Sequence, residues 1–165
     1  MLSCILSDTL EFRSPTTTQE DKAIAHDLAK DLGIDISAYA SEMFEAKSDI
    51  SAFSDAELLR MDSKEFKVDG KQFRVSVLET TAPKLVLDRK DSLMASMVDV
   101  AAEDGADEVL LFVVDILNEE ATLMVPNGMV KTVAEKSFGA IVTGDTVVLP
   151  GIMSRKKQII PNLKV

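Results

Sequence analysis

The sequence predicts an α/β (α+β) fold, in which a mixed β-sheet of about five strands carries packed helices and follows a helical N-terminal segment. Residues 109–114 form a continuous apolar run, which is typical of a strand buried on both faces. Residues 64–80 alternate apolar and charged positions around Asp69-Gly70, which indicates a β-hairpin. Residues 83–103 begin with a proline and show a helical apolar stripe. A buried strand beside a hairpin and a long helix predicts the mixed sheet.

Two helices are predicted ahead of the sheet. The first spans residues 19–32, with Thr17 or Thr18 available as its N-cap and Gly33 at its end. The second spans residues 36–46. Apolar positions in the first helix recur at helical spacing, so we expect it to bury the face made of Ala23, Ile24, Leu28 and Leu32.

A polar connector at residues 48–54 marks the predicted domain boundary. It separates an N-terminal part, residues 1–47, from a larger domain, residues 50–165. The larger domain is expected to contain, besides the elements above, a short helix at 54–60, a strand at 121–125, a helix at 130–137 and strands at 145–149 and 158–162.

The composition is that of an acidic globular protein. Of the 165 residues, 46% are hydrophobic and 28% are charged, and the formal net charge is −10. A protein of this sign is repelled by nucleic acid and by anionic membranes, so neither is an expected partner. Cys4 is the only cysteine, which rules out an internal disulfide and favours a cytoplasmic location.

The first residues lack the basic and long apolar regions of a signal peptide, and no apolar run is long enough to span a bilayer. The opening resembles the interior of a longer protein.

Three consecutive cations stand out near the C-terminus. Arg155, Lys156 and Lys157, called here the cationic run, follow a Pro150-Gly151 turn and precede an apolar stretch that starts at Ile159. Adjacent cations repel, so they need an anion nearby or full solvation. Arginine offers a planar fork of donors that matches phosphate oxygens, and lysine adds a compact charge. The run is therefore a candidate phosphate-binding loop, and an ordinary solvated turn is the alternative. Side chains that point away from any concavity, or that are paired with local carboxylates, would contradict the first interpretation.

Other polar residues carry less information on their own. Asp8 follows the apolar pair Ile5-Leu6, so it suits either a cation site at the end of a strand or a turn. Lys64 is not distinguishable from neighbouring lysines by pattern alone. His26 lies in a helix without metal-ligating partners and is expected on the surface, and Asp115 is expected to have a structural role at a strand end.

Several motifs together resemble one family. They are Ile5-Leu6-Ser7-Asp8-Thr9-Leu10 with Phe12-Arg13-Ser14-Pro15-Thr16, Asp62-Ser63-Lys64-Glu65-Phe66, Val114-Asp115-Ile116-Leu117-Asn118, and Ser154-Arg155-Lys156-Lys157-Gln158 before Ile-Ile-Pro. In this order they resemble the C-terminal, DHH-associated domain of the family II, manganese-dependent inorganic pyrophosphatases. Residues 1–47 resemble the last strand and helices of that family's metal-binding DHH domain, and residues 50–165 its substrate-binding domain.

The resemblance implies hydrolysis of pyrophosphate to two phosphates in the complete enzyme. It implies that Arg155, Lys156 and Lys64 bind pyrophosphate as the domain closes like a lid, and that Asp8 is one manganese ligand. Mn²⁺ is the implied cofactor, with Mg²⁺ or Co²⁺ as alternatives, and the parent enzyme is expected to be a homodimer.

The resemblance also implies that most metal ligands belong to an N-terminal DHH domain that this chain lacks. We therefore expect the chain alone to bind no metal tightly and to be inactive, while it retains weak phosphate or pyrophosphate binding. Three alternatives stay open: a free-standing anion-binding regulatory module, an interaction module whose first 47 residues dock on a partner, and a domain of another DHH phosphoesterase that acts on polyphosphate or oligonucleotides.

Overall fold

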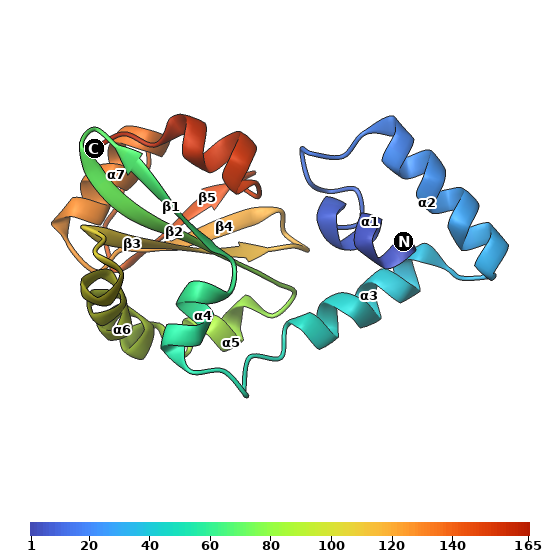
Figure 1. Ribbon diagram of the computed structural model, residues 1–165, viewed down its shortest axis with the longest axis horizontal. Helices are drawn as coiled ribbons and strands as arrows, with labels where there is room; N and C mark the ends of the chain where they lie inside the picture. Colours follow the sequence, from blue (N-terminus) through green and yellow to red (C-terminus); the bar gives the residue numbers. More distant parts are fainter.

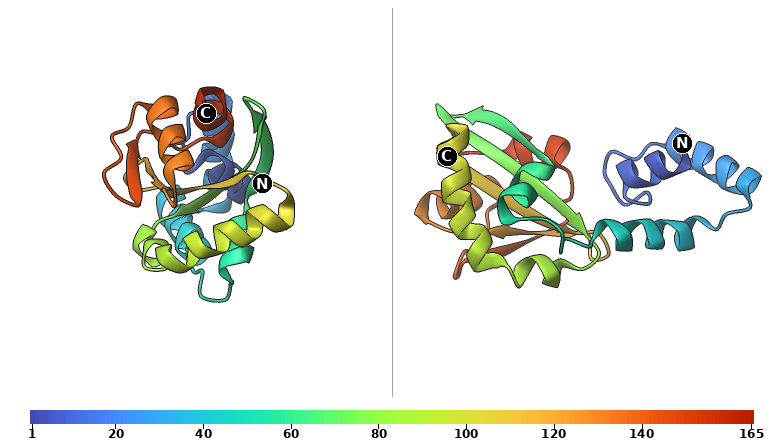
Figure 2. Two further views of the ribbon diagram at one scale, coloured as in Figure 1. Left: turned by 90° about the vertical axis from the view of Figure 1, so that its left-hand side faces the viewer. Right: turned by 60° about the horizontal axis from the view of Figure 1, so that its bottom comes forward.

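The computed structural model describes all 165 residues, which form a helical part and a sheet part (Figure 1). The helical part consists of α1 (Leu2–Thr9), α2 (Gln19–Leu32) and α3 (Ile36–Lys47). Helix α3 leads from the helical part to the sheet part, and the rest of the helical part stands off from the sheet (Figure 2, right). No helix is both long and apolar enough to cross a bilayer.

The sheet part is built on five strands in the order β1-β2-β3-β4-β5. Strands β2 and β3 are parallel and the other neighbours are antiparallel, so the predicted mixed sheet is confirmed. The elements are α4 (Asp55–Met61), β1 (Ser63–Val68), β2 (Lys71–Thr80), α5 (Pro83–Leu87), α6 (Lys90–Asp104), β3 (Glu108–Asp115), β4 (Glu120–Met124), α7 (Gly128–Phe138), β5 (Thr146–Pro150), the π-helix η1 (Arg155–Ile159) and the 3₁₀-helix η2 (Ile160–Asn162).

Helices cover both faces of the sheet, which makes three layers (Figure 1). Strand β3 is buried along nearly its whole length, as its apolar run predicts. Its side chains alternate between two cores because successive residues of a strand point to opposite faces. Val109, Leu111 and Val113 join the core under α4, α5 and α6, whereas Leu110, Phe112 and Val114 join the core that includes residues of α7 and η1.

The predicted hairpin is present. Strand β1 pairs with β2 in the register Phe66↔Phe73, and Asp69-Gly70 forms the two-residue turn. Both turn residues have positive φ, 50° and 83°, which is the conformation that a tight turn between right-twisted strands requires.

The long helix predicted at 83–103 is wrong in one respect, because the chain leaves the helix around Arg89 and forms α5 and α6. The Arg89 guanidinium reaches back to the connector between α3 and α4. It pairs with Asp55 at 2.5 Å and donates to the carbonyls of Ile50 and Phe53 at 3.2 and 3.0 Å. These long-range contacts accompany the break, and no glycine or proline in the sequence signals it.

The strand predicted at 158–162 is wrong, because this segment is helical. The Gln158 side chain accepts the backbone N–H groups of Met153 and Ser154, and the Ser154 hydroxyl accepts that of Lys157 at 3.2 Å. Pro161 has no N–H to donate to a sheet, but it fits the first turn of η2. The short apolar run therefore belongs to the end of η1 and to η2, and Ile159 is buried against the sheet.

Two expectations for the helical part also need correction. Residues 2–9 form a helix and not a strand, because Leu2 and Leu6 share one buried helical face. Helix α2 buries Ala25 and Ala29, and of the predicted face only Leu28 packs, partly buried, against the core. Within that face Leu32 is 61% exposed, since the small alanines are the side chains that allow close packing in this core.

Candidate functional site

An open cleft lies between the helical part and the sheet part. It has a volume of about 530 Å³. Its lining residues come from α1, α3 and the sheet part, and are Ser3, Cys4, Ser7, Asp8, Met43, Asp62 and Glu79. The α1 residues and the sheet-part carboxylates are far apart in sequence, so the cleft exists only because α3 places the two parts beside each other (Figure 2).

Arg155 lies beside the cleft, where it pairs with the lining residue Asp62. It is the first residue of η1, directly after the Ser154 cap. Its Nη2 lies 2.8 Å from Asp62 Oδ1, and its Nη1 donates to the carbonyl oxygens of Asp62 and Val75 at 2.8 and 3.5 Å. The Arg155 side chain is only 16% exposed. The candidate anion-binding arginine is thus fixed, and a local carboxylate is its present partner, which differs from the free cation that the sequence interpretation requires.

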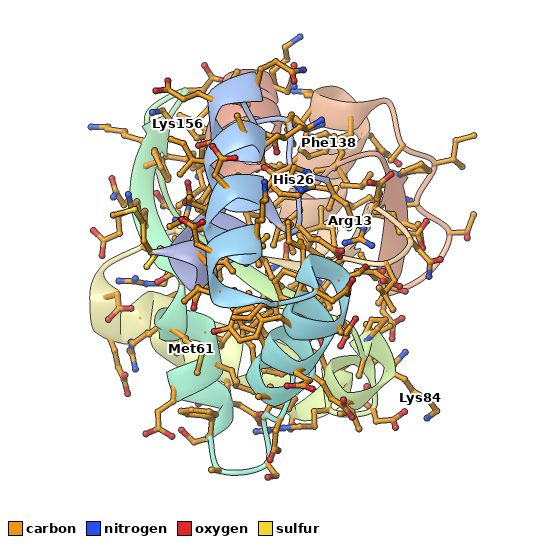
Figure 3. All side chains as sticks on the ribbon, turned by 90° about the vertical axis from the view of Figure 1, so that its right-hand side faces the viewer. Arg13, His26, Met61, Lys84, Phe138 and Lys156 are labelled. Atoms are coloured by element: carbon orange, nitrogen blue, oxygen red, sulfur yellow. The ribbon has the colours of Figure 1, made fainter.

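The two lysines of the cationic run differ from Arg155 and from each other. Lys156 is exposed, and its side chain makes no hydrogen bond or ion pair within the chain. Figure 3 places it on the side of the molecule that carries the β1–β2 hairpin. Lys157 donates to the carbonyl of Pro15 at 2.9 Å, so it ties the sheet part to the helical part. Lys156 is therefore free to meet an anion, whereas Lys157 has a defined structural contact.

The structure distinguishes Lys64 from Lys67 but not from Lys71, whose register partner Val68 lies on the same face as Lys64. Lys64, Phe66 and Val68 alternate along β1, so they project from the same face of the sheet. Phe66 and Val68 pack against the core on the η1 side, which places Lys64 on the η1 side as well. Its register partner is Val75, whose carbonyl Arg155 contacts. Lys67 projects from the opposite face.

Asp8 lines the cleft from the helical part. It is exposed in the last turn of α1, so the expectation of a strand-end carboxylate is wrong in its secondary structure. Asp62 and Glu79 reach the same cleft from the sheet part. Carboxylate oxygens suit a hard divalent cation, but no group of three or more His, Cys, Asp or Glu side chains gathers in the chain to hold one. Asp62 pairs with Arg155 and Glu79 pairs with Lys47, which leaves Asp8 as the cleft carboxylate without an ion pair.

Asp62 is the site residue that pattern reasoning missed. It ends α4 and directly precedes β1, two residues before Lys64. Its sequence signal was limited to membership in a family motif. The partner of Asp62 is Arg155, 93 residues further along the chain, so no local pattern could have paired them.

Asp115 and His26 match their expected roles. The Asp115 carboxylate accepts the backbone N–H groups of Leu117 and Asn118 at 3.0 and 3.1 Å, which forms the turn that ends β3. His26 is exposed on α2, and its ring lies 5.8 Å from that of Phe12 (Figure 3).

The fold and the site define a class: an α/β domain that carries a fixed arginine beside an open cleft, which it shares with a helical segment. Residues 41–165 match the family model described as the DHHA2 domain. The chain belongs to the DHHA2 domain family.

Relatives and a solved structure agree with that assignment. The chain is 46% identical to a probable manganese-dependent inorganic pyrophosphatase of Deinococcus radiodurans, over 99% of this chain and 54% of the relative. It is 39% identical to a protein of the same description in Lactiplantibacillus plantarum, over 99% of this chain and 52% of the relative.

The crystal structure of a Methanococcus jannaschii putative family II inorganic pyrophosphatase superposes with a TM-score of 0.84 and 35% identity, over 98% of this chain and 52% of that chain. The chain therefore spans about half the length of the relatives that it matches.

Proposed function

We propose that this chain is the substrate-binding part of a manganese-dependent inorganic pyrophosphatase. In this proposal residues 50–165 bind pyrophosphate, and residues 1–47 complete a metal-binding part that other residues supply. The observation that carries the proposal is the ion pair between Arg155 and Asp62, a residue that lines the same cleft as Asp8. The descriptions of the relatives as manganese-dependent inorganic pyrophosphatases support the choice of pyrophosphate and of manganese.

The contribution of this chain to the reaction is electrostatic. Pyrophosphate carries several negative charges, and its hydrolysis requires one phosphoryl group to be held in place while charge shifts toward the leaving phosphate. Arg155 offers a rigid fork to two phosphate oxygens, and Lys156 and Lys64 add mobile charges on the same side of the sheet. Because Arg155 is already fixed by backbone carbonyls, little conformational freedom is lost when the anion binds.

Phosphate release from pyrophosphate tests this proposal. With Mn²⁺ present, we expect no turnover by this chain alone. We expect turnover when the chain is fused to the portion of the Deinococcus relative that it does not match. Enzyme-like turnover by the lone chain would contradict the division of roles. A chimera that shows a cooperative thermal transition but releases no phosphate would contradict the proposed substrate.

A further inference from the structure

Asp62 occupies the position on Arg155 that an anionic ligand would take. The guanidinium has two kinds of partner: backbone carbonyls on Nη1 and the Asp62 carboxylate on Nη2. A carboxylate and a phosphoryl group offer the same chemistry to an arginine fork, namely two oxygens that accept charge-assisted hydrogen bonds. The two anions therefore compete for the same face of the guanidinium.

The two sides of this ion pair differ in mobility. The Asp62 side chain is 53% exposed, whereas that of Arg155 is 16% exposed. The Asp62 backbone is fixed, because its carbonyl also accepts the N–H of Val77 at 2.9 Å. Rotation of the Asp62 side chain into water therefore leaves α4, β1 and the guanidinium in place. Such a half-exposed pair is weak enough to be exchanged.

We propose that Asp62 is an internal competitor for the phosphate-binding face of Arg155, so that pyrophosphate must displace its carboxylate from the guanidinium in order to bind. This inference rests on the function proposed above. It adds a residue that sets the affinity of the site by opposing the substrate. Without pyrophosphate, the pair neutralises Arg155 beside the cleft that Asp62 lines.

Calorimetric titration of this chain with sodium pyrophosphate in metal-free buffer tests the proposal. Asp62→Asn keeps the shape of the side chain and removes its charge. We expect the variant to bind pyrophosphate about two- to fivefold more tightly than the wild type, the range that a partly exposed ion pair supports. Its melting temperature is expected to stay close to that of the wild type, because the backbone contacts of Asp62 remain.

Glu79→Gln is the matched control. Glu79 is a second carboxylate of the same cleft, but its partner is Lys47 at 2.6 Å and not Arg155. We expect its pyrophosphate affinity to stay within about twofold of the wild type, because a carboxylate without a direct contact acts only through a screened field. Equal gains in both variants would overturn the proposal in favour of a general charge effect.

The remaining outcomes separate this inference from the proposed function. An Asp62→Asn affinity that is unchanged or weaker overturns the inference. If Arg155→Ala loses pyrophosphate binding in the same titration, the proposed function stands even though the inference about Asp62 fails. Binding by Asp62→Asn but not by the wild type supports the inference in its strongest form. Absence of binding by both proteins overturns the inference and the proposed anion site together.

Discussion

Replacing Arg155 by alanine is expected to weaken pyrophosphate binding by this chain about thirtyfold or more. Truncation of one partner in a hydrogen-bonded charge contact of this kind typically costs at least about 2 kcal/mol. Arg155 lies beside the cleft, and its partners are Asp62, between α4 and β1, and Val75 of β2. Its removal also leaves the Asp62 carboxylate at the cleft without its counter-charge, which adds repulsion of the anion. Calorimetric titration with pyrophosphate measures the effect.

Lys157→Ala is the matched control for that experiment. It removes the same charge from the same run, but Lys157 donates to the Pro15 carbonyl and has no place in the proposed contact. We expect its affinity to fall about threefold or less, through the loss of a screened charge alone. Arg155→Lys should give an intermediate affinity, because it keeps the charge and loses the planar fork. Equal losses in the Arg155 and Lys157 alanine variants would contradict a specific role for Arg155.

Asp104→Ala is expected to lower the free energy of unfolding by about 2 kcal/mol, the scale of lost hydrogen bonds to charged groups. Asp104 Oδ1 accepts from Arg60 Nη2 at 3.1 Å, and Oδ2 lies 2.7 Å from Arg74 Nε. That Nε is buried and has no hydrogen-bond partner, so its contact with Asp104 stabilises the fold as an ion pair. Without Asp104, the buried side of Arg74 has no anion.

The network of Asp104, Arg60 and Arg74 is relevant to the candidate site because of where these residues lie in the fold. Arg60 belongs to α4, and Arg74 also contacts Ser63 and Glu65 of β1 at 2.7 and 2.6 Å. The network therefore holds both sides of the segment that carries Asp62 and Lys64. For a chain of this length, we expect the melting temperature of Asp104→Ala to fall by about 4–8 °C. Asp88→Ala is the control, since it breaks an exposed pair with Lys84, and it should shift the melting temperature little.

The same network gives a dependence of stability on pH. The pKa of Asp104 is lowered, first by the hydrogen bond from Arg60 and further by the charge of Arg74. A carboxyl with a lowered folded-state pKa stabilises the fold above its unfolded pKa, about 3.9, and this stabilisation is lost as the pH falls through the folded value. Wild type and Asp104→Ala should therefore differ most in melting temperature at neutral pH, and the difference should shrink below about pH 4. A difference that grows toward acid pH would contradict this role.

Local sequence patterns predicted the strands of the sheet more accurately than the structure of the segments near the two chain ends. The apolar run of β3 and the Asp69-Gly70 turn carry their own structural signal, and both are confirmed. Residues 2–9 and 158–162 are short apolar stretches, and in such stretches strand and helix periods cannot be told apart by composition. In both cases tertiary packing decides: Leu6 and Ile159 are completely buried in one core.

The residues of the candidate site also divide into those that the sequence indicated and those that only the tertiary structure revealed. Family motifs pointed to Arg155, Lys156, Lys64 and Asp8, and the structure places Arg155 beside the cleft, Asp8 in its wall and Lys64 on the same sheet face as η1. The choice of Lys64 over Lys67 as a binding residue depends on which alternate residues of β1 point toward η1. The sequence alone does not show which face of β1 is covered. The pairing of Arg155 with Asp62 joins two segments 93 residues apart, so only the tertiary fold reveals it.

The location of bound pyrophosphate is the central claim, and heteronuclear NMR of the ¹⁵N-labelled chain during a pyrophosphate titration measures it most directly. We expect saturable shifts at the backbone signals of residues 154–157 and 62–64 and at the side-chain signal of the Arg155 guanidinium, with the α6 and α7 signals unchanged. Shifts confined to other lysine-bearing surfaces, or a guanidinium signal that does not respond at saturating pyrophosphate, would contradict the assignment of this cleft as the substrate site.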